Sequence, residues 1–502
     1  MDLTAAWRAR AREELASREF DLLVIGGGIV GAGVASEAAR LGLAVALVDR
    51  GDFGGATSGA SSKLIHGGLR YLRLGDVRLV REAHRERRAL LRVVAPHLVR
   101  RLPFLLPVYR GGPYRPRVLQ AGLWLYSTLA REPLGGLVPP ERARRSVPEL
   151  RVEGLKGCGL YADAWTHDSR LCLANVRAAA DAGATVLNYA EVTELRNVGG
   201  RVAGAEVGDR LGDGRAGLSV SARAVVNATG PWVDVVRRLE DPHAARSSRL
   251  SKGAHVLVKL ESPWSAALTI IHDKVRVSFA VPWEGMLLLG TTDTLYEGDP
   301  GSVEATPDDV ASILAEASVA VDSRELRPEA VRSTFAGLRV LPGTGGATAT
   351  ARRETVLLRG PAGMVSVAGG KLTTYRRIAL QVLNALRGEL GLHRLPAAPV
   401  PLPGATGLAR AAERLASRGD LEPAVRSHLL HLYGSLAEEV VGLADEDASL
   451  LERLHPEAPD IAAQARYATE REWACTTEDL LRRRTTLGLR GVGVAEPEKR
   501  RA

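Results

Sequence analysis

Three glycines near the start of the chain have the spacing of a dinucleotide-binding turn. Gly26, Gly28 and Gly31 form the pattern G-x-G-x-x-G directly after a short apolar run. In this pattern the first glycine permits a tight turn, the second lets a pyrophosphate approach the backbone, and the third lets a helix pack closely on a strand. Asp49 follows at roughly the 20-residue distance that places a carboxylate on a ribose hydroxyl. These residues predict a dinucleotide site rather than a purely structural glycine-rich turn.

The residues after Asp49 are small and rich in hydroxyl groups. The run from Ala56 to Lys63 cannot form a core, and it suits a loop whose backbone and hydroxyls wrap a polar ligand. His66 and Arg70 follow it among glycines and apolar residues. A lone histidine there would usually be structural. A histidine, a double glycine and an arginine beside a nucleotide site instead indicate a functional segment.

A second strand–glycine–helix unit stands far along the chain. Met364 to Val367 read as a strand, and Gly369 to Thr373 lead into a helix that reaches about Leu386. Two glycine-rich helix starts so far apart suit a long cofactor such as FAD, since NAD would need only the first. The positive end of the second helix would face the flavin N1–C2 carbonyl, where reduction places negative charge.

Basic residues outside these motifs indicate an anionic substrate. Paired guanidinium groups clamp phosphate or carboxylate oxygens, and such a clamp also orients the reacting carbon. Oxidation of an alcohol further requires a base for the hydroxyl proton, and His255 or His66 could serve. The basic residues in question are Arg70, Arg339, Arg352 and Lys371.

The elements expected around these residues alternate between strand and helix. A strand at Leu22–Ile25, an alanine-rich helix at Ile29–Leu41 and a strand at Ala44–Val48 form the first unit. The α/β pattern returns after Leu160. The elements expected there are a helix at Asp168–Ala182, a strand at Ala184–Asn188, a small antiparallel meander at Glu191–Leu195, Val202–Val207 and Leu218–Ala222, and a buried strand that ends in a turn at Ala224–Trp232.

Residues 250–300 read as an antiparallel sheet that can roof a cofactor. Its strands are expected at Ala254–Leu260, Leu268–His272, Val275–Val281 and Met286–Gly290. A helix is expected at Thr306–Ala320. The proline-rich linker at 391–404 then leads to a helical segment that reaches about Leu487.

Two further stretches each allow two interpretations. Val77 to Val94 read as a helix with many arginines, and that face is either solvated or attracted to anionic lipid. Val118 to Leu129 read as a markedly apolar helix that is either buried or interfacial. The solvated face and the buried helix are the favoured interpretations.

The composition sets the broad class. With 502 residues, ordinary hydrophobic and charged fractions and a net charge of +9, the chain is expected to have several domains and an acidic partner. Three cysteines provide neither a disulfide framework nor a paired metal spacing, so no metal is expected. No stretch approaches the roughly 18 apolar residues of a transmembrane helix, and residues 1–19 lack a signal-peptide core. The cytoplasmic side is the default.

Together these patterns predict an α/β (α+β) fold. It combines a Rossmann-like FAD-binding domain, an antiparallel-sheet substrate domain and an all-α C-terminal cap domain. The expected boundaries are 20–75, 155–250 and 335–390 for a discontinuous FAD-binding domain, 76–154 and 251–334 for the substrate-binding domain, and 405–490 for the helical domain.

Several of these motifs resemble those of the FAD-dependent (aerobic-type) glycerol-3-phosphate dehydrogenase family. The likeness is closest over Ser61–Leu72, and it runs in the right order from about residue 20 to about residue 486. The other similar stretches are Asn227–Trp232, Gly290–Asp293, Gly369–Arg376 and Glu478–Thr485.

The resemblance implies oxidation of sn-glycerol 3-phosphate to dihydroxyacetone phosphate, with hydride passing from C2 to flavin N5 and electrons going on to quinone. It also implies peripheral contact with an anionic membrane surface on the cytoplasmic side, no nucleic acid, and a homodimer as one open assembly. His255 is the favoured base and His66 the runner-up. By motif match the substrate would lie among Arg70, Tyr71, Arg339, Arg352 and Lys371. The residues expected to bind FAD are Gly26, Gly28, Gly31, Asp49, Arg50, Thr57, Ser58, Ser61, Ser62, His66, Gly67, Val192, Ala228, Thr229, Gly230, Gly370, Lys371, Leu372 and Thr373.

Some positions depart from the family pattern. Asp49 stands where a longer glutamate is commoner, which should only shift the ribose contact. Phe335 and Val340 replace a tyrosine and a proline, and Arg353–Glu354 replace an aspartate and an aromatic residue or histidine. These changes bear on the shape of the pocket more than on the class of reaction.

Two other functions remain open. One is a glycerol-3-phosphate oxidase that uses oxygen, or another amine or amino-acid oxidase-like flavoenzyme, because function lives in the site and not in the fold. An amino-acid substrate would need only one carboxylate clamp. The other is an FAD-stabilised, nucleic-acid-associated binding protein, which salt-dependent nucleic-acid binding would support.

Overall fold

The computed structural model describes residues 3–69, 72, 75–112, 116–133, 135–212, 217–273, 276–343, 355–396 and 398–493. Its first sheet has the strand order β17-β18-β10-β1-β2-β7, and the pairs from β18 to β7 are parallel. These strands span Val356–Arg359 (β17), Val365–Ala368 (β18), Leu218–Asn227 (β10), Glu19–Ile25 (β1), Val45–Val48 (β2) and Thr185–Leu187 (β7). β2 and β18 are buried throughout, as expected of parallel strands that are covered on both faces.

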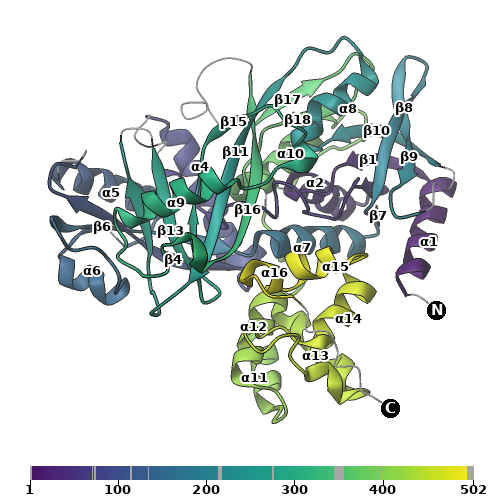
Figure 1. Cartoon of the computed structure of the whole chain (residues 1–502). Helices are drawn as coiled ribbons and strands as arrows, with labels where there is room; N and C mark the ends of the chain where they lie inside the picture. The colour runs from purple at the N-terminus through teal and green to yellow at the C-terminus, as the bar shows by residue number, and fades with distance from the viewer. Residues whose placement is uncertain are drawn as a thin grey trace.

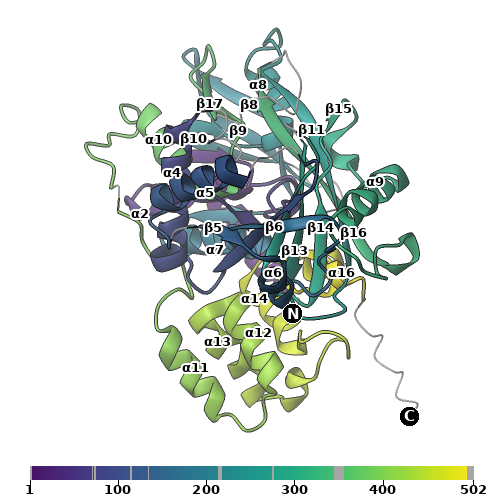
Figure 2. The same ribbon diagram turned by 90° about the vertical axis from the view of Figure 1, so that its left-hand side faces the viewer.

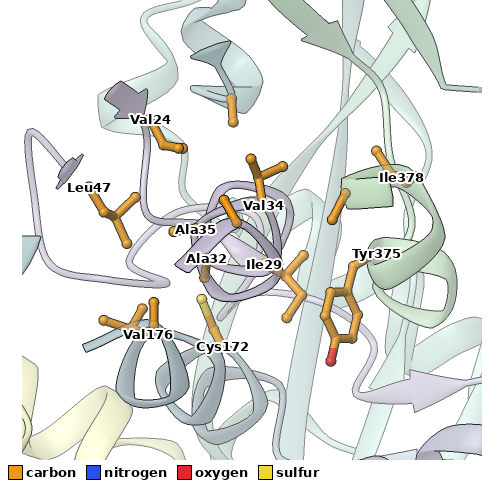
Figure 3. Packing of buried hydrophobic residues seen from close by; sticks show 14 of the residues in the cluster. Val24, Ile29, Ala32, Val34, Ala35, Leu47, Cys172, Val176, Tyr375 and Ile378 are labelled. Carbon is orange, nitrogen blue, oxygen red and sulfur yellow. The ribbon is translucent and has the colours of Figure 1, made fainter. Parts of the chain in front are cut away.

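One face of this sheet is covered by three helices (Figure 1). α2 (Ile29–Arg40) packs between α7 (Asp168–Asp181) and α10 (Tyr375–Ala385). Figure 3 shows Cys172 of α7 and Tyr375 of α10 on different sides of α2. Gly33 permits this close packing, because a Cβ at that position would lie 2.7 Å from Cδ2 of Tyr375. The helix that carries the glycine motif is therefore held rigidly from two sides.

The opposite face is covered by α1 (Leu3–Ser17), α8 (Val233–Glu240) and the hairpin of β8 (Ala190–Val198) and β9 (Arg201–Asp209). Alternate residues of β1 point to opposite faces of the sheet and pack into the hydrophobic cores on those two faces. Val24 packs toward α2, whereas Leu23 packs toward α1 and the hairpin. The predicted meander is confirmed, because β8, β9 and the first half of β10 pair antiparallel.

The second sheet has the order β15-β11-β14-β13-β12-β4-β6-β3, with β16 on β11 and β5 on β6. Its members are β3 (Leu64–Ile65), β4 (Val99–Tyr109), β5 (Gly136–Val138), β6 (Leu155–Thr166), β11 (Ser248–Lys259), β12 (Ala267–Ile271), β13 (Val277–Trp283), β14 (Met286–Gly290), β15 (Thr294–Tyr296) and β16 (Val331–Pro342). The predicted antiparallel roof is thus confirmed, although Val275, where one strand was expected to begin, lies outside the described residues. Figure 2 shows α9 (Pro307–Ser318) and α5 (Pro116–Ala130) on different sides of this sheet.

The long strands β4, β6 and β16 of this sheet were not expected from the sequence, nor were the short strands β3, β5 and β15. β4 carries Pro103 and Pro107, and proline removes a backbone donor, so the local pattern argues against a strand. Its pairing with β6 nevertheless runs from Val99 to Tyr109. β6 opens the range 155–250 that the sequence assigned to the FAD-binding domain, yet all of its pairing lies in the second sheet.

The C-terminal segment forms a helical unit with its own core. Figures 1 and 2 place it below α7 and beside α16 (Leu487–Arg490). The helices of this unit are α11 (Leu408–Ser417), α12 (Pro423–Tyr433), α13 (Ala437–Gly442), α14 (Ala462–Arg471) and α15 (Thr477–Asp479). Among the described residues, none of the helices combines the length and the apolar character needed to span a membrane.

The two stretches with open interpretations are both helical. The first comprises α4 (Val77–Ala89) and a π-helical turn at Leu90–Val94. The second lies within α5, which buries Leu119, Leu123 and Tyr126 on one side. Its other side is exposed, with 63% of Val118, 49% of Trp124 and 47% of Leu125 accessible to solvent. The helix therefore has both a buried face and an outward apolar face.

Candidate active site

A cavity of about 1740 Å³ lies between the two sheets. Ligand pockets usually measure about 300–1,000 Å³, so this one has room for an extended cofactor and a small substrate together. It is lined by these residues that the sequence nominated: Gly26, Gly28, Asp49, Arg50, Thr57, Ser58, Ser61, Ser62, His66, Gly67, Val192, Ala228, Thr229, Gly230, His255, Arg339, Gly370, Lys371, Leu372 and Thr373. Arg70, Tyr71 and Arg352, also nominated, lie outside the described residues.

The glycine turn at one end of the cavity tolerates no side chain. Gly26 has φ +102°, and a Cβ there would lie 2.7 Å from the carbonyl oxygen of Ala228. A Cβ on Gly31 would overlap the carbonyl oxygen of Gly26. Gly31 does not line the cavity, and its role is the close approach of helix to strand that the sequence predicted. Gly28 caps α2, so the N-terminal end of that helix lies beside the cavity.

Asp49 holds this turn in shape from the end of β2. Its Oδ2 accepts a hydrogen bond from the Gly27 N–H at 2.6 Å, and its Oδ1 accepts one from the Gly51 N–H at 2.8 Å. Burial raises the pKa of this carboxyl to about 6, and the two backbone hydrogen bonds oppose that rise. Each carboxylate oxygen retains a second lone pair, so the group can also accept a hydrogen bond from a ribose hydroxyl.

The hydroxyl-rich loop crosses the cavity between the sheets. Ser58 Oγ accepts the N–H of Ile29 at 2.8 Å, and Thr57 Oγ1 donates to the carbonyl of Leu338 at 2.7 Å. Lys63 anchors the end of the loop from beneath, because its Nζ lies 2.6 Å from Oδ1 of Asp168 and both side chains are 1% exposed. The loop is therefore tied to helices α2 and α7 on one side and to strand β16 of the second sheet on the other.

His255 lies buried on β11. Its Nε2 lies 2.9 Å from Ser62 Oγ, and its ring stacks on Phe335 with centroids 4.7 Å apart. Burial, together with the positive charges of Arg339 and Lys63, holds the pKa of His255 well below its usual range. A neutral imidazole can accept a proton, which is what a general base requires. The serine fixes one ring nitrogen and Phe335 fixes the ring plane.

Strand register brings Arg339 to the same face. β11 and β16 pair antiparallel with His255 opposite Phe335, Gly253 opposite Gly337, and Ser251 opposite Arg339. Residues two apart on a strand share a face, so these three rungs all face the cavity. A Cβ on Gly253 would lie 2.7 Å from Cζ of Arg339, so the guanidinium lies above Gly253. It donates to Thr291 Oγ1 at 2.8 Å and to the Thr292 carbonyl at 3.1 Å.

The second glycine unit closes the opposite wall. Gly370 has φ +139°, and Lys371 precedes a short 3₁₀ turn at Leu372–Thr374 that runs into α10. Thr373 Oγ1 accepts the backbone N–H of His66 at 3.2 Å. This hydrogen bond connects the segment that contains His66 to the start of the second helix, α10. A cofactor that contacts both segments would need them to lie side by side. His66 itself contributes to the cavity wall.

The structure adds a network that the sequence did not explain. Arg484 donates to both carboxylate oxygens of Asp52, at 2.6 and 2.9 Å, and Arg483 pairs with the same group. These guanidinium groups outweigh burial and lower the pKa of Asp52. Arg170 binds Glu472 through two hydrogen bonds of 2.6 and 2.7 Å. The terminal stretch Glu478–Thr485 therefore docks against the loop that follows β2, and its run of three arginines was the only local signal.

One part of the cavity lining, which we call the apolar arm, is formed by apolar side chains of β4, α5, β12 and β13. On α5 the lining also includes Val118 and Leu125, which are exposed to solvent. The arm is lined by Phe104, Leu106, Leu119, Leu123, Ile271 and Phe279.

Comparison with known proteins matches most of the chain. Residues 21–376 match the family model described as FAD dependent oxidoreductase, and residues 396–498 match that of the C-terminal domain of alpha-glycerophosphate oxidase. The chain is 38% identical to "Glycerol-3-phosphate dehydrogenase 2" of Mycobacterium tuberculosis (strain ATCC 25618 / H37Rv), over 98% of this chain and 86% of that protein. It is 34% identical to a glycerol-3-phosphate dehydrogenase of Synechocystis sp., over 95% and 90%.

Comparison with solved structures gives the same family. The glycerol-3-phosphate dehydrogenase from Bacillus halodurans complexed with FAD superposes with a TM-score of 0.76 at 30% identity, covering 96% of this chain and 89% of that one. A glycine oxidase from Geobacillus kaustophilus, at 22% identity and a TM-score of 0.55, covers 77% of this chain and 99% of its own and shares the fold alone. The predicted fold and the predicted FAD dependence are both confirmed by these matches.

Proposed function

The chain belongs to the FAD-dependent glycerol-3-phosphate dehydrogenase family, and from this premise we propose that it oxidises sn-glycerol 3-phosphate to dihydroxyacetone phosphate. The observation that carries the proposal is the pairing of a neutral histidine with an arginine on two adjacent strands of the substrate sheet. The guanidinium of Arg339 lies above Gly253, two residues from His255 on β11. Two residues of a strand span about 7 Å, so the two side chains can contact opposite ends of one small substrate.

The residues of the chain divide the work between binding and proton transfer. Arg339 and Lys371 bind the phosphate, and Arg70, Tyr71 and Arg352 are proposed to complete that site. His255 takes the proton of the C2 hydroxyl, since the low pKa of this histidine leaves its imidazole neutral. Bound FAD supplies the acceptor for the hydride of C2, at flavin N5. His66 is the alternative base.

The residues nominated for FAD are proposed to hold it across both glycine units. The helix start at Gly28 receives the pyrophosphate and Asp49 the ribose, while the turn from Gly370 to Thr373 faces the flavin. The proposed fit of FAD rests on the glycine turn at Gly26 and Gly31, the FAD cradle, where any Cβ would collide with backbone atoms. It also rests on a single cavity whose lining includes both helix starts.

Quinone is the proposed electron acceptor. The apolar arm would admit a lipid-dissolved ring, and two residues of the cavity lining, Val118 and Leu125, belong to the exposed apolar side of α5. Arg117 and Arg131, at the two ends of that helix, are exposed as well. An apolar helix face flanked by cations suits an anionic membrane surface, here the cytoplasmic leaflet. Oxygen remains the second candidate, because the C-terminal region matches a model described from an alpha-glycerophosphate oxidase.

Steady-state assays with a soluble quinone, and separately with oxygen alone, test the acceptor. We expect turnover with quinone to exceed oxygen consumption by at least tenfold (about 1.4 kcal/mol in barrier). Equal or faster turnover with oxygen would instead identify an oxidase.

A flotation assay tests the proposed membrane contact separately. Trp124→Glu/Leu125→Glu should lose flotation with anionic liposomes, whereas Val198→Glu, at an even more exposed apolar position on the β8–β9 hairpin, should float as wild type does.

A further inference from the structure

A cluster of histidines surrounds one carboxylate at the junction of three parts of the molecule. His167 lies between β6 and α7, Glu284 in the turn between β13 and β14, and His431 on α12 of the C-terminal helical unit. None of the three lines the active-site cavity. The cluster is therefore separate from the site described above.

The three side chains are spaced as metal ligands are. Glu284 Oε1 lies 3.0 Å from Nε2 of His167 and 3.1 Å from Nδ1 of His431. One ligand atom from each of the three residues lies within 4.8 Å of the other two. In tetrahedral zinc sites the metal–ligand distances of 2.0–2.2 Å place neighbouring ligand atoms about 3.3 Å apart. Binding an ion would therefore need only small shifts of the side chains.

Burial and ring packing hold these ligands in place. The side chains of His167, Glu284 and His431 are 7%, 12% and 4% exposed. His431 stands edge-on to Trp165, with centroids 4.9 Å apart, and His167 contacts Trp283 at 4.8 Å. Such rings cannot turn freely, so the directions of their nitrogens are fixed by packing.

One ring nitrogen of the cluster has no hydrogen-bond partner among the described residues. Within the described part of the chain, Nε2 of His431 is buried and has no hydrogen-bond partner. If the ring gives its proton to Glu284 through Nδ1, this second nitrogen is a buried acceptor with nothing to accept. If Nδ1 instead binds a metal, Nε2 carries the proton and is a buried donor, so this nitrogen is unpartnered within the described ranges in both arrangements and the proposal rests on the geometry of the three ligand atoms.

The other carboxylate oxygen already has its own neighbours. Glu284 Oε2 lies 3.6 Å from Nδ1 of His428 and 3.7 Å from Nη2 of Arg490. His428 in turn lies 2.9 Å from Asp460. These groups orient the carboxylate and leave Oε1 turned toward His167 and His431. A ligating carboxylate in proteins is commonly supported by a second set of contacts of this kind.

From this geometry we propose that His167, Glu284 and His431 form a binding site for a divalent transition-metal ion, with Zn²⁺ as the best match to two imidazoles and one carboxylate. A water molecule would take the fourth position. The ion would fasten α12 to the hairpin of β13 and β14 and to the start of α7. Its role is structural, and it is independent of the proposed oxidation of glycerol 3-phosphate.

Titration of chelator-treated, FAD-loaded protein with Zn²⁺ in a calorimeter tests the site, with metal content measured by mass spectrometry. We expect one Zn²⁺ per chain and a melting temperature that rises by a few degrees on binding. His167→Gln and His431→Gln should each weaken Zn²⁺ binding by at least tenfold. His243→Gln is the matched control, because that histidine is exposed and far along the chain from the cluster, and it should bind as wild type does.

X-ray absorption at the zinc edge on the wild-type protein gives an answer even if the variants fail to fold. The expected spectrum shows two imidazoles and oxygen ligands only. Wild-type protein that takes up no Zn²⁺, a His431→Gln variant that binds as tightly as wild type, or a spectrum without imidazole would each overturn the site. None of these readouts measures turnover, so they fail or succeed separately from the proposed enzymatic function.

Discussion

The two ends of the active-site cavity are built in different ways. At the cofactor end the chain offers backbone groups, with Gly26, Gly28 and Gly31 clearing space at a helix start. At the substrate end it offers side chains, with His255 and Arg339 on neighbouring antiparallel strands. The first end depends on the absence of side chains and the second on their identity. The two ends should therefore respond differently to substitution, and that difference can be measured.

The largest effect is expected where a side chain enters the backbone-built end. Gly31→Val would drive a side chain into the carbonyl oxygen of Gly26, so the protein should purify without FAD and without activity. The measurement is the flavin absorbance per protein. Gly388→Ala is the matched control, since a Cβ there meets nothing within 4 Å, and it should keep its FAD. Normal flavin content in Gly31→Val would refute the cradle.

The next effect concerns proton transfer at the side-chain end. His255→Ala should lower kcat by about 10²–10⁴-fold while FAD content stays normal, because a positioned base contributes about that much. The comparison is His66→Ala, measured in the same assay. Near-normal turnover in His255→Ala, together with lost turnover in His66→Ala, would move the role of base to His66.

Arg339→Lys is expected to act mainly on substrate binding. Lysine keeps the charge but loses the planar fork, so KM for glycerol 3-phosphate should rise about 10–100-fold while FAD affinity is unchanged. Steady-state kinetics and an FAD titration of the apoprotein separate the two effects. An unchanged KM would contradict the role of Arg339 in binding the phosphate. A loss of FAD would instead indicate that Arg339 contacts the cofactor.

The smallest effect is a pH dependence at the cofactor end. Burial raises the pKa of Asp49 to about 6, above its ordinary value near 4, so the free carboxyl keeps its proton between these pH values. A ribose hydroxyl donates to the ionised form, so FAD affinity should rise as pH rises through about 6. At pH 5 it should be about tenfold weaker than at pH 7.5. Asp49→Asn should flatten this profile, and an unaltered profile in that variant would contradict the role.

The same contrast explains what the sequence could and could not predict. The first β-strand, α2 and β2 were predicted because their pattern lies within thirty residues and each glycine has a local reason. Lys63 was singled out near the ligand loop, yet it is buried against Asp168, a partner 105 residues away. No local pattern reports such a pairing.

Prolines and long-range register account for the remaining differences. β4 was missed because Pro103 and Pro107 interrupt it, and β16 because its partner β11 lies some eighty residues earlier. The cluster around Glu284 draws its histidines from positions 167 and 431, so no metal-ligand spacing appears in the chain. The roles of the nominated site residues, including Arg70, Tyr71 and Arg352, stay predictions.

Anaerobic mixing of the flavin-loaded protein with glycerol 3-phosphate tests the central claim most directly. The absorbance of oxidised flavin at roughly 450 nm should disappear rapidly. Plain glycerol at the same concentration should leave it unchanged, because the phosphate-binding side chains would have nothing to hold. No bleaching by glycerol 3-phosphate, with bleaching by an amino acid instead, would keep the fold and contradict the proposed substrate.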